Sequence, residues 1–463
     1  MIQTELTPKN IGQDRTYPDN DIAMAKCFHE ANTKLGSKLG YVAEAEAWYW
    51  YTGKRWKKDV GNLWVREQCK NFVEALARHV KSLNDVSEEG EKFSAYVEDL
   101  HDFPRRKRLI TDTESVAPWS LTAFDRDSRL LNCQNGTYSL ADMTFRPHDP
   151  ADLITNLSRV HYDPEARCAR WEQFISEIMC DDVETARFLQ KSLAYAISGD
   201  MSRECFFVFY GNKTRNGKST LLETIAYMLD SYARTIQPQT LARRTTDGAK
   251  PSPDLARLKG ARLVRMPEPE KGLEINAGLV KQLTGGESCV ARLLHRNLIE
   301  FRPEFNIVIN ANHLPRTSDP TIFESGRVKL IPFDRHFTPE EQDTGLKQQF
   351  RQEEAMSGIF NWLLEGYRLL QAEGLDLPDR VKTAIEGYRF GVDVIGTFIR
   401  EVLTESPKNR IATSELHAVY EAWAIQNGYT PLSNKNFTPE LRERHVVRRD
   451  GDTGNVLVGF AFK

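Results

Sequence analysis

FYGNKTRNGKSTLLETI, residues 209–225, decides the fold class of this chain. It continues an apolar run from Cys205, which predicts a buried strand, and it leads into a helix whose apolar residues share one face. A glycine-containing loop between a buried strand and a helix N-terminus points backbone N–H groups inward, where the helix dipole adds positive potential. The stretch therefore predicts a phosphate-binding loop in an α/β nucleotide-binding domain.

The residue types in this loop suit ATP and Mg²⁺. We expect Lys218 to reach the β- and γ-phosphates and the Ser219 hydroxyl to hold the metal ion. The other residues expected to contact the nucleotide are Gly211, Asn216, Gly217 and Thr220. The alternative is an ordinary strand-to-helix turn.

One spacing in the loop is irregular. Five residues separate Gly211 from Gly217, where the usual pattern has four. Asn212 stands where the pattern places a glycine, and asparagine tolerates left-handed backbone better than most residues.

Composition limits what else the chain can be. Its 463 residues predict two to four domains, and a net charge of −3 means that any contact with nucleic acid must come from local patches. The seven cysteines show no Cys-x-x-Cys spacing, as expected of reduced thiols rather than a zinc site. The polar N-terminus and the lack of 18 consecutive apolar residues predict neither export nor a membrane partner. We therefore expect a cytoplasmic protein.

Acidic and amide side chains follow two further predicted strands. Residues 261–266 lead to Glu268 and Glu270, an arrangement typical of a Walker B segment. We expect Glu268 to lie near the metal ion and Glu270 to polarise the nucleophilic water, although the sequence does not decide which carboxylate does the chemistry. Two plain loop carboxylates are the alternative. The strand predicted at 305–311 ends at Asn312, which is either a simple strand terminator or a residue that orients water and senses the γ-phosphate.

Five segments in this order resemble the superfamily 3 helicases, most closely the phage and plasmid primase-helicase family related to the poxvirus primase-helicase. The segments are YGNKTRNGKST, LKGARLVRMPEPEKG, LVKQLTGGE, FNIVINANHLPR and DPTIFESGRVKLIPFDRHF. The resemblance extends upstream through LLNCQNGTYSL, YDPEARCARWEQFI and LQKSLAYAISGD and downstream through residues 416–449. Family members often carry an N-terminal primase, so the chain is expected to be the helicase half alone.

The resemblance implies a multidomain α/β protein. The expected units are a flexible N-terminus (1–19), a mostly helical, collar-like domain (20–193), an AAA+-like P-loop ATPase core with a parallel sheet (194–350), a helical linker or lid (351–400) and a winged-helix-like domain (401–463). Hairpins are predicted at 47–56 and 130–140, and an amphipathic helix at 358–371. The basic run 105–108 is either a solvated face or a nucleic-acid patch.

The family also implies a homo-hexamer with ATP sites between subunits. A neighbouring subunit would supply an arginine finger, for which Arg327 is the first candidate and Arg316 the second; a surface ion pair is the alternative for either.

Residues 288–303 predict a hairpin with a basic tip. In the family this hairpin enters the channel of the ring, so DNA contacts are expected from Lys281, Arg292, His295 and Arg296. A solvent-exposed turn is the alternative. At the C-terminus a helix at 433–444 and a turn at 451–454 carry basic residues that suit either duplex DNA or a docked protein.

Together these features predict an ATP- and Mg²⁺-dependent helicase that acts on single-stranded and forked DNA. It would serve replication of a phage, plasmid or other mobile element, in the bacterial cytosol in that case, with a separate primase or other replication protein as a partner. An origin-binding initiator or loader that does not unwind processively is the main alternative, and a small-molecule P-loop kinase is another.

Overall fold

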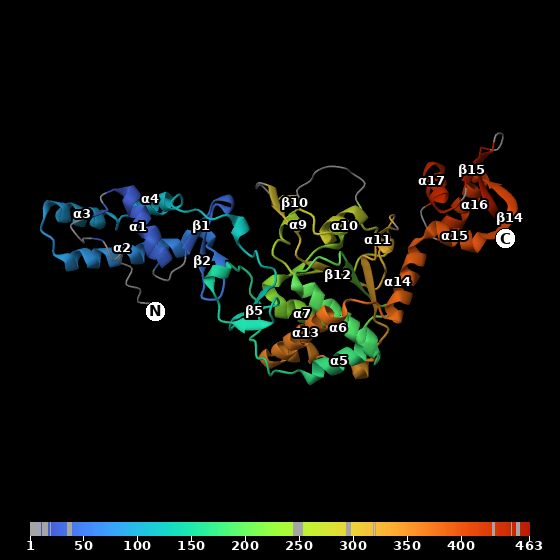
Figure 1. Ribbon diagram of the computed structural model, residues 1–463, viewed down its shortest axis with the longest axis horizontal. Helices are drawn as coiled ribbons and strands as arrows, with labels where there is room; N and C mark the ends of the chain where they lie inside the picture. The colour runs from blue at the N-terminus through green and yellow to red at the C-terminus, as the bar shows by residue number, and fades with distance from the viewer. Residues whose placement is uncertain are drawn as a thin grey trace.

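The structure of the chain is a computed structural model. It describes residues 11, 17–18, 20–34, 39–243, 253–292, 298–317, 319, 321–427, 431–445, 447–450 and 454–463. Figure 1 shows three parts that follow one another along the longest axis: N-terminal helices in blue, a central α/β core, and a C-terminal part in red.

The N-terminal part is a helical bundle with a small antiparallel sheet. Its elements are α1 (Asp21–Lys34), β1 (Leu39–Val42), β2 (Ala47–Tyr51), β3 (Trp56–Lys58), α2 (Leu63–Leu83), α3 (Glu88–Asp99) and α4 (Phe103–Thr113). The predicted hairpin at 47–56 is confirmed, since β2 pairs antiparallel with β3. The segment expected to be flexible is anchored at two points: Ile11 is buried against this bundle, and the Tyr17 ring stacks on Phe93 at 4.8 Å between centroids.

The next elements belong to the central α/β core rather than to the helical bundle. They are β4 (Leu130–Asn132), β5 (Thr137–Ser139), β6 (Thr144–Arg146), α5 (Ala169–Met179) and α6 (Val183–Ser198). The β4–β5 pairing confirms the hairpin predicted at 130–140. The expected boundary at residue 193 is wrong, because it falls inside α6, and α6 packs on α13 (Glu353–Glu373): the Gln190 side chain donates to Trp362 O at 2.8 Å.

A five-stranded parallel sheet forms the centre of the molecule. Its order is β13 (Val328–Pro332), β7 (Phe206–Tyr210), β12 (Asn306–Ala311), β9 (Leu263–Met266) and β8 (Ala233–Thr235), and every neighbouring pair is parallel. Alternate residues of β7 enter different apolar clusters, Phe207 and Phe209 on one face and Phe206 and Val208 on the other. A strand buried on both faces requires a continuous apolar sequence, which is why the run before the phosphate loop is so hydrophobic.

Helices and a hairpin cover the two faces of this sheet. They are α7 (Lys218–Leu229), α8 (Pro238–Leu241), α9 (Pro253–Ala256), α10 (Ala277–Thr284), β10 (Cys289–Arg292), β11 (Leu298–Phe301), α11 (Thr321–Glu324) and α12 (Leu346–Gln349). Helix α13 contains the predicted amphipathic helix at 358–371, but it is not a lid. Leu363 and Leu364 are buried in the same cluster as α5, α6 and α7.

The C-terminal part is a small three-stranded antiparallel sheet with helices packed on it. Its elements are α15 (Val394–Val402), β14 (Leu403–Ala412), α16 (Thr413–Gln426), α17 (Asn434–Arg444), β15 (Val447–Asp450) and β16 (Gly454–Phe462). Helix α14 (Asp379–Val392) precedes this part and packs on the central core, where Tyr388 is buried with Val328 and Leu330 of β13. Helix α17 confirms the helix predicted at 433–444; the predicted turn at 451–454 lies outside the described residues except for Gly454. The boundary expected at residue 400 lies within α15, whose Phe398 and Ile399 are buried with Tyr420 of α16.

All seven cysteines are free thiols. Among the described residues, no helix is long and apolar enough to cross a membrane.

Candidate ATPase site

The phosphate loop lies at the carboxyl edge of the parallel sheet, between β7 and α7. Gly211 begins it where the backbone is crowded: a Cβ there would lie 2.4 Å from Asn216 Nδ2 and 2.5 Å from the carbonyl oxygen of Phe333. Only glycine fits such an approach without displacing backbone. The sheet therefore fixes the start of the loop.

The end of the loop is fixed by a second glycine. Gly217 has a φ of 88°, and a Cβ on it would lie 2.3 Å from Ile178 Cγ2 of α5. The left-handed backbone expected at Asn212 is wrong: Arg215 adopts it instead, with a φ of 57°. The additional residue between Gly211 and Gly217 is therefore accommodated at Arg215, close to the start of α7, where Arg215 O also accepts from Phe337 N at 2.9 Å.

Asn216 shapes the loop from inside. Its side chain is 5% exposed, Nδ2 donates to Lys213 O at 2.7 Å, and Oδ1 accepts from Lys218 N at 3.4 Å. Asn216, which was expected to contact the nucleotide, is thus occupied with the loop's own backbone.

The first turn of α7 leaves backbone donors for an anion. Gly217 is the N-cap and has no side chain to satisfy the N–H groups of the following residues. Ser219 is exposed and Thr220 is half-buried at this turn. N–H groups at a helix N-terminus, together with the positive end of its dipole, form a site for phosphate.

Lys218 is buried and held by oxygen atoms from two strand ends. Its Nζ donates to Gly211 O at 3.1 Å, to Ala311 O at 3.1 Å and to Asn312 Oδ1 at 2.6 Å. Burial lowers the pKa of Lys218 to about 8, against the opposing effect of Glu268. A buried ammonium group whose hydrogen-bond acceptors are all neutral oxygens is stabilised strongly when an anion binds beside it.

Asn312 connects this lysine to the predicted Walker B acid. Its Nδ2 donates to Glu268 Oε2 at 2.9 Å, so a continuous chain of hydrogen bonds runs from Lys218 through Asn312 to Glu268. The two strands involved, β9 and β12, are parallel neighbours, and their carboxyl ends meet at one edge. Glu270 is exposed two residues farther along, where its carbonyl accepts from Leu273 N.

Asn310 is a residue of the site that was not predicted from the sequence. It lies one position before the end of β12, and its Nδ2 donates to Ser219 Oγ at 3.4 Å. The signal for it was a polar residue near the end of a mostly apolar strand, but only the pairing of β12 with β7 brings Asn310 to the loop.

The oxygen atoms of this edge fit a Mg²⁺ ion held mainly by nucleotide and water. Ser219 supplies a hydroxyl and Glu268 a carboxylate, both of which are hard ligands. Among the described residues, no group of three or more His, Cys, Asp or Glu side chains could hold a metal ion by itself.

Arg327 lies at the amino end of the parallel strands, whereas the phosphate loop lies at their carboxyl end. It immediately precedes β13, whose residue Val328 pairs with Phe206 at the beginning of β7, whereas the loop follows the end of β7. Its guanidinium contacts Glu204 Oε2 at 2.5 Å and Thr284 Oγ1 at 2.9 Å. Arg327 is therefore too far along the sheet to reach the phosphate loop of its own chain, since five strand residues span about 16 Å.

Arg316, the second finger candidate, lies at the same edge as the loop. Its N–H donates to Leu273 O at 2.7 Å, and its carbonyl accepts from Ile275 N at 2.8 Å. These bonds tie the segment after β12 to the segment after Glu268.

The hairpin predicted at 288–303 is confirmed as a pair of strands. Residues of β10 and β11 pair antiparallel from Cys289–Phe301 to Arg292–Leu298. His295 and Arg296, and the side chain of Arg292, lie outside the described part of the chain. The Lys281 side chain forms an ion pair, with Nζ 2.7 Å from Asp319 Oδ2.

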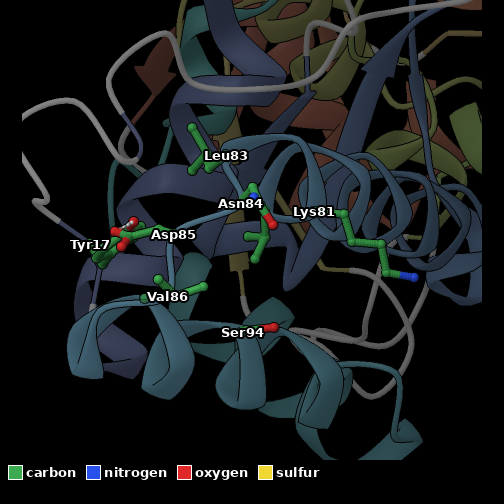
Figure 2. Close-up of a pocket in the computed structure, with 9 residues that line it drawn as sticks. Tyr17, Lys81, Leu83, Asn84, Asp85, Val86 and Ser94 are labelled. Atoms are coloured by element: carbon green, nitrogen blue, oxygen red, sulfur yellow. Dashed lines mark hydrogen bonds between the residues drawn. The ribbon is translucent and has the colours of Figure 1, made fainter.

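A separate hollow lies far from this chemistry, between α2 and α3 of the N-terminal bundle (Figure 2). Tyr17 and Asp85 close one side of it, with the Tyr17 hydroxyl donating to Asp85 Oδ2 at 2.6 Å. No residue predicted for catalysis lines it.

Two parts of the chain match known protein families. Residues 25–180 match the family described as "D5 N terminal like", and residues 391–447 match the one described as "Poxvirus D5 protein-like".

Viral proteins named "putative helicase" are similar over longer stretches. One from Acanthamoeba polyphaga mimivirus is 26% identical over 416 residues, covering 82% of this chain and 43% of that protein. One from Invertebrate iridescent virus 3 is 24% identical over 375 residues, covering 73% of this chain and 39% of that protein. The chain thus spans less than half the length of these curated relatives.

A solved structure shares the fold. The ligand-free A form of the C-terminal region of NrS-1 is 11% identical, covers 95% of this chain and 99% of that one, and superposes with a TM-score of 0.51. The similarity concerns the fold alone.

Proposed function

We propose that this chain, which belongs to the D5-like primase-helicase family, is a superfamily 3 DNA helicase that hydrolyses ATP with Mg²⁺ and moves along single-stranded DNA. The observation that carries the proposal is the chain of hydrogen bonds from Lys218 through Asn312 to Glu268 at the mouth of the phosphate loop.

Each member of that chain has a distinct role in the proposal. The loop N–H groups and Lys218 bind the β- and γ-phosphates, and the lysine exchanges neutral oxygens for anionic ones as it does so. Ser219 and Glu268 hold Mg²⁺, which supplies neutralisation of the phosphate charge when bound. Asn312 holds the carboxylate of Glu268, and because it also contacts Lys218 it links the presence of a γ-phosphate to the end of β12. The exposed Glu270 polarises the attacking water.

The position of Arg327 supports a ring. Because it lies at the far edge of its own sheet, the nucleotide it would stabilise belongs to a neighbouring subunit, as a finger acting in trans requires. We therefore propose a homo-hexamer with ATP between subunits. The hairpin β10–β11 would face the strand that passes through the ring, with sequence-independent contacts to phosphates.

The proposed role is replication of a phage, plasmid or other mobile element, with single-stranded and forked DNA as substrates and a primase or other replication protein as a partner.

An origin-binding initiator is a second candidate, favoured by the C-terminal part. Four basic side chains are exposed on α17 and β15, namely Lys435, Arg442, Arg448 and Arg449. A basic helix beside a β-hairpin suits duplex DNA.

One experiment separates the two candidates. ATP hydrolysis is measured with and without single-stranded DNA, in the presence of a forked duplex that carries a fluorophore and a quencher. ATP-dependent strand separation supports the helicase, whereas stimulated hydrolysis with a closed fork supports the initiator.

Two variants test the assignment of the site in the same assay. Lys218→Ala should abolish nucleotide binding, and Glu268→Ala should preserve binding but stop turnover. Lys213→Ala is the matched control, because Lys213 lies exposed in the same loop. Full ATPase activity in the Lys218→Ala chain would refute the phosphate-loop assignment.

A further inference from the structure

A second positively charged site lies where the N-terminal sheet meets the ATPase core. We call it the junction hollow; its lining includes Tyr49, Arg55, Lys57, Lys58, Phe124 and Lys259. Figure 1 shows β2 between the N-terminal helices and the core, and a hydrogen bond joins the parts there, from Lys259 Nζ to Leu121 O at 3.4 Å. The hollow is therefore built by both parts of the chain.

Cationic side chains outnumber acidic ones in the lining of the hollow, which holds Arg55, Lys57, Lys58 and Lys259 but one carboxylate, Asp125. Among the described residues, none of Arg55, Lys57 and Lys259 forms an ion pair. Asp125, the one carboxylate in the lining, is already engaged, since Oδ1 accepts from Thr155 N at 2.8 Å and Oδ2 from the Thr155 hydroxyl. Although Asp125, Glu44 and Glu304 act on Lys259, the lining keeps an excess of positive charge that suits an external anion.

More positive charge lies behind it on the edge strand β8. Burial lowers the pKa of Arg234 and the nearby charge of Arg257 lowers it further, whereas Asp230 acts in the opposite direction and Arg55 adds a smaller lowering effect. Burial also lowers the pKa of Lys259 in spite of the surrounding acids. Neither Arg234 nor Arg257 has an ion-pair partner in the described chain. Like charges gathered at a half-buried site are unfavourable unless an anion joins them.

An aromatic side chain stands beside these cations. The ring of Tyr49 stacks on the buried Phe124 at 4.9 Å between centroids, and it remains partly exposed in the lining of the hollow. A supported aromatic ring next to several cations is the combination with which proteins bind single-stranded nucleic acid: bases stack on the ring while the cations neutralise phosphates.

We propose that the junction hollow binds single-stranded DNA, with Arg55, Lys57 and Lys259 on the phosphates and Tyr49 against a base. The site is separate from the hairpin β10–β11 and lies outside the ATPase site. It rests on the proposed function for the identity of its ligand, and it would hold the strand on the side of the ring formed by the N-terminal parts.

The test is equilibrium binding of a fluorescein-labelled oligo-dT of about 20 nucleotides, a length that exceeds one binding site. Binding is followed by anisotropy between about 50 and 200 mM salt without nucleotide, the range over which phosphate contacts change affinity strongly. The variant is the full chain with Lys57→Ala and Lys259→Ala.

Losing two phosphate contacts should lower the slope of log K against log salt by about 1.4 and weaken binding on the order of ten-fold near 0.1 M salt. Lys57→Arg with Lys259→Arg keeps both charges and should restore affinity. Tyr49→Leu should weaken binding several-fold without changing the slope. The matched control removes two exposed lysines elsewhere in the N-terminal part, Lys26→Ala with Lys92→Ala, and should bind like the wild type.

An unchanged affinity and slope in the Lys57/Lys259 variant would overturn the inference, as would an equal loss in the control or tighter hollow-dependent binding of a duplex of the same length. ATP hydrolysis without DNA, measured in parallel, separates this inference from the proposed function. If hydrolysis and unwinding occur but the hollow variant binds normally, only the junction site fails; if the hollow binds DNA but ATP is not hydrolysed, only the motor fails.

Discussion

Asn312→Ala is the substitution that most directly tests how the site works. It removes the acceptor 2.6 Å from Lys218 Nζ and the donor 2.9 Å from Glu268 Oε2. A hydrogen bond to a charged group contributes about 1.5–3 kcal/mol, and the exposure of Glu268 places its bond at the lower end, about 1.5 kcal/mol. If that bond holds Glu268 in its productive position, its loss should lower kcat by about ten-fold or more.

Nucleotide affinity should change much less. Lys218 keeps two acceptors, Gly211 O and Ala311 O, so we expect the Kd for ATP to stay within about three-fold of the wild type, because a competing partner of the ammonium is removed at the same time. The assays are steady-state hydrolysis and equilibrium binding of a fluorescent ATP analogue.

Two further variants sharpen this test. Asn312→Asp keeps an acceptor for Lys218 but turns a carboxylate toward Glu268, so its kcat should be as low as that of Asn312→Ala. Asn212→Ala, at an exposed position of the loop, should behave like the wild type. A wild-type kcat in the Asn312→Ala chain would refute the role of this hydrogen-bonded chain.

Three other predictions concern the ring, the lysine and the loop. Mixing Arg327→Ala subunits into wild-type protein should lower ATPase activity more than in proportion to their fraction. Glu204→Ala subunits, which lack the same ion pair but keep the arginine, should not lower activity in this way. A strictly proportional loss with Arg327→Ala would count against a finger acting in trans. Since burial lowers the pKa of Lys218 to about 8 and only its charged form attracts phosphate, ATP affinity should fall by up to about ten-fold per pH unit above pH 8. Equilibrium binding of a fluorescent ATP analogue, followed from neutral pH to above pH 8, measures this fall, and an affinity that stays constant above pH 8 would contradict it. Gly217→Ala and Gly272→Ala both place a side chain at a φ near +87°, a strain of about 1–2 kcal/mol, but only the Cβ at position 217 would meet another residue, Ile178. Thermal unfolding should therefore show a larger fall in Tm for Gly217→Ala. Equal falls in Tm would contradict the packing of the loop on α5.

Local patterns predicted those parts of the fold that local physics controls. The strand, loop and helix around Lys218 were predictable because burial on both faces demands an apolar strand and phosphate binding demands glycine at a tight turn. The hairpins at 47–56 and 130–140 were predictable from their turn residues for the same reason.

Features that depend on long-range packing were not predictable. Nothing in the sequence of α6 states that its apolar face will meet α13, about 170 residues later, so the boundary at 193 was misplaced. The left-handed residue of the loop is Arg215 and not Asn212, because contacts from Phe337 and α5 decide where the extra residue is accommodated. Likewise the site residue Asn310 acquires its partner only through the pairing of β12 with β7.

The two ends of the sheet constrain how subunits can associate. The carboxyl edge carries Lys218, Asn312 and Glu268, and the opposite edge carries Arg327. If Arg327 completes the nucleotide site of a neighbour, the amino end of one subunit's sheet must meet the carboxyl end of the next subunit's sheet. A heterologous contact of this kind closes into a ring or extends into a filament, depending on the rotation between neighbours. A two-fold dimer meets the same requirement only where one surface patch holds both Arg327 and the phosphate loop, so that each subunit completes the site of the other. In either assembly the site of a single subunit would be incomplete, so the concentration dependence of ATP hydrolysis would be a direct readout of assembly.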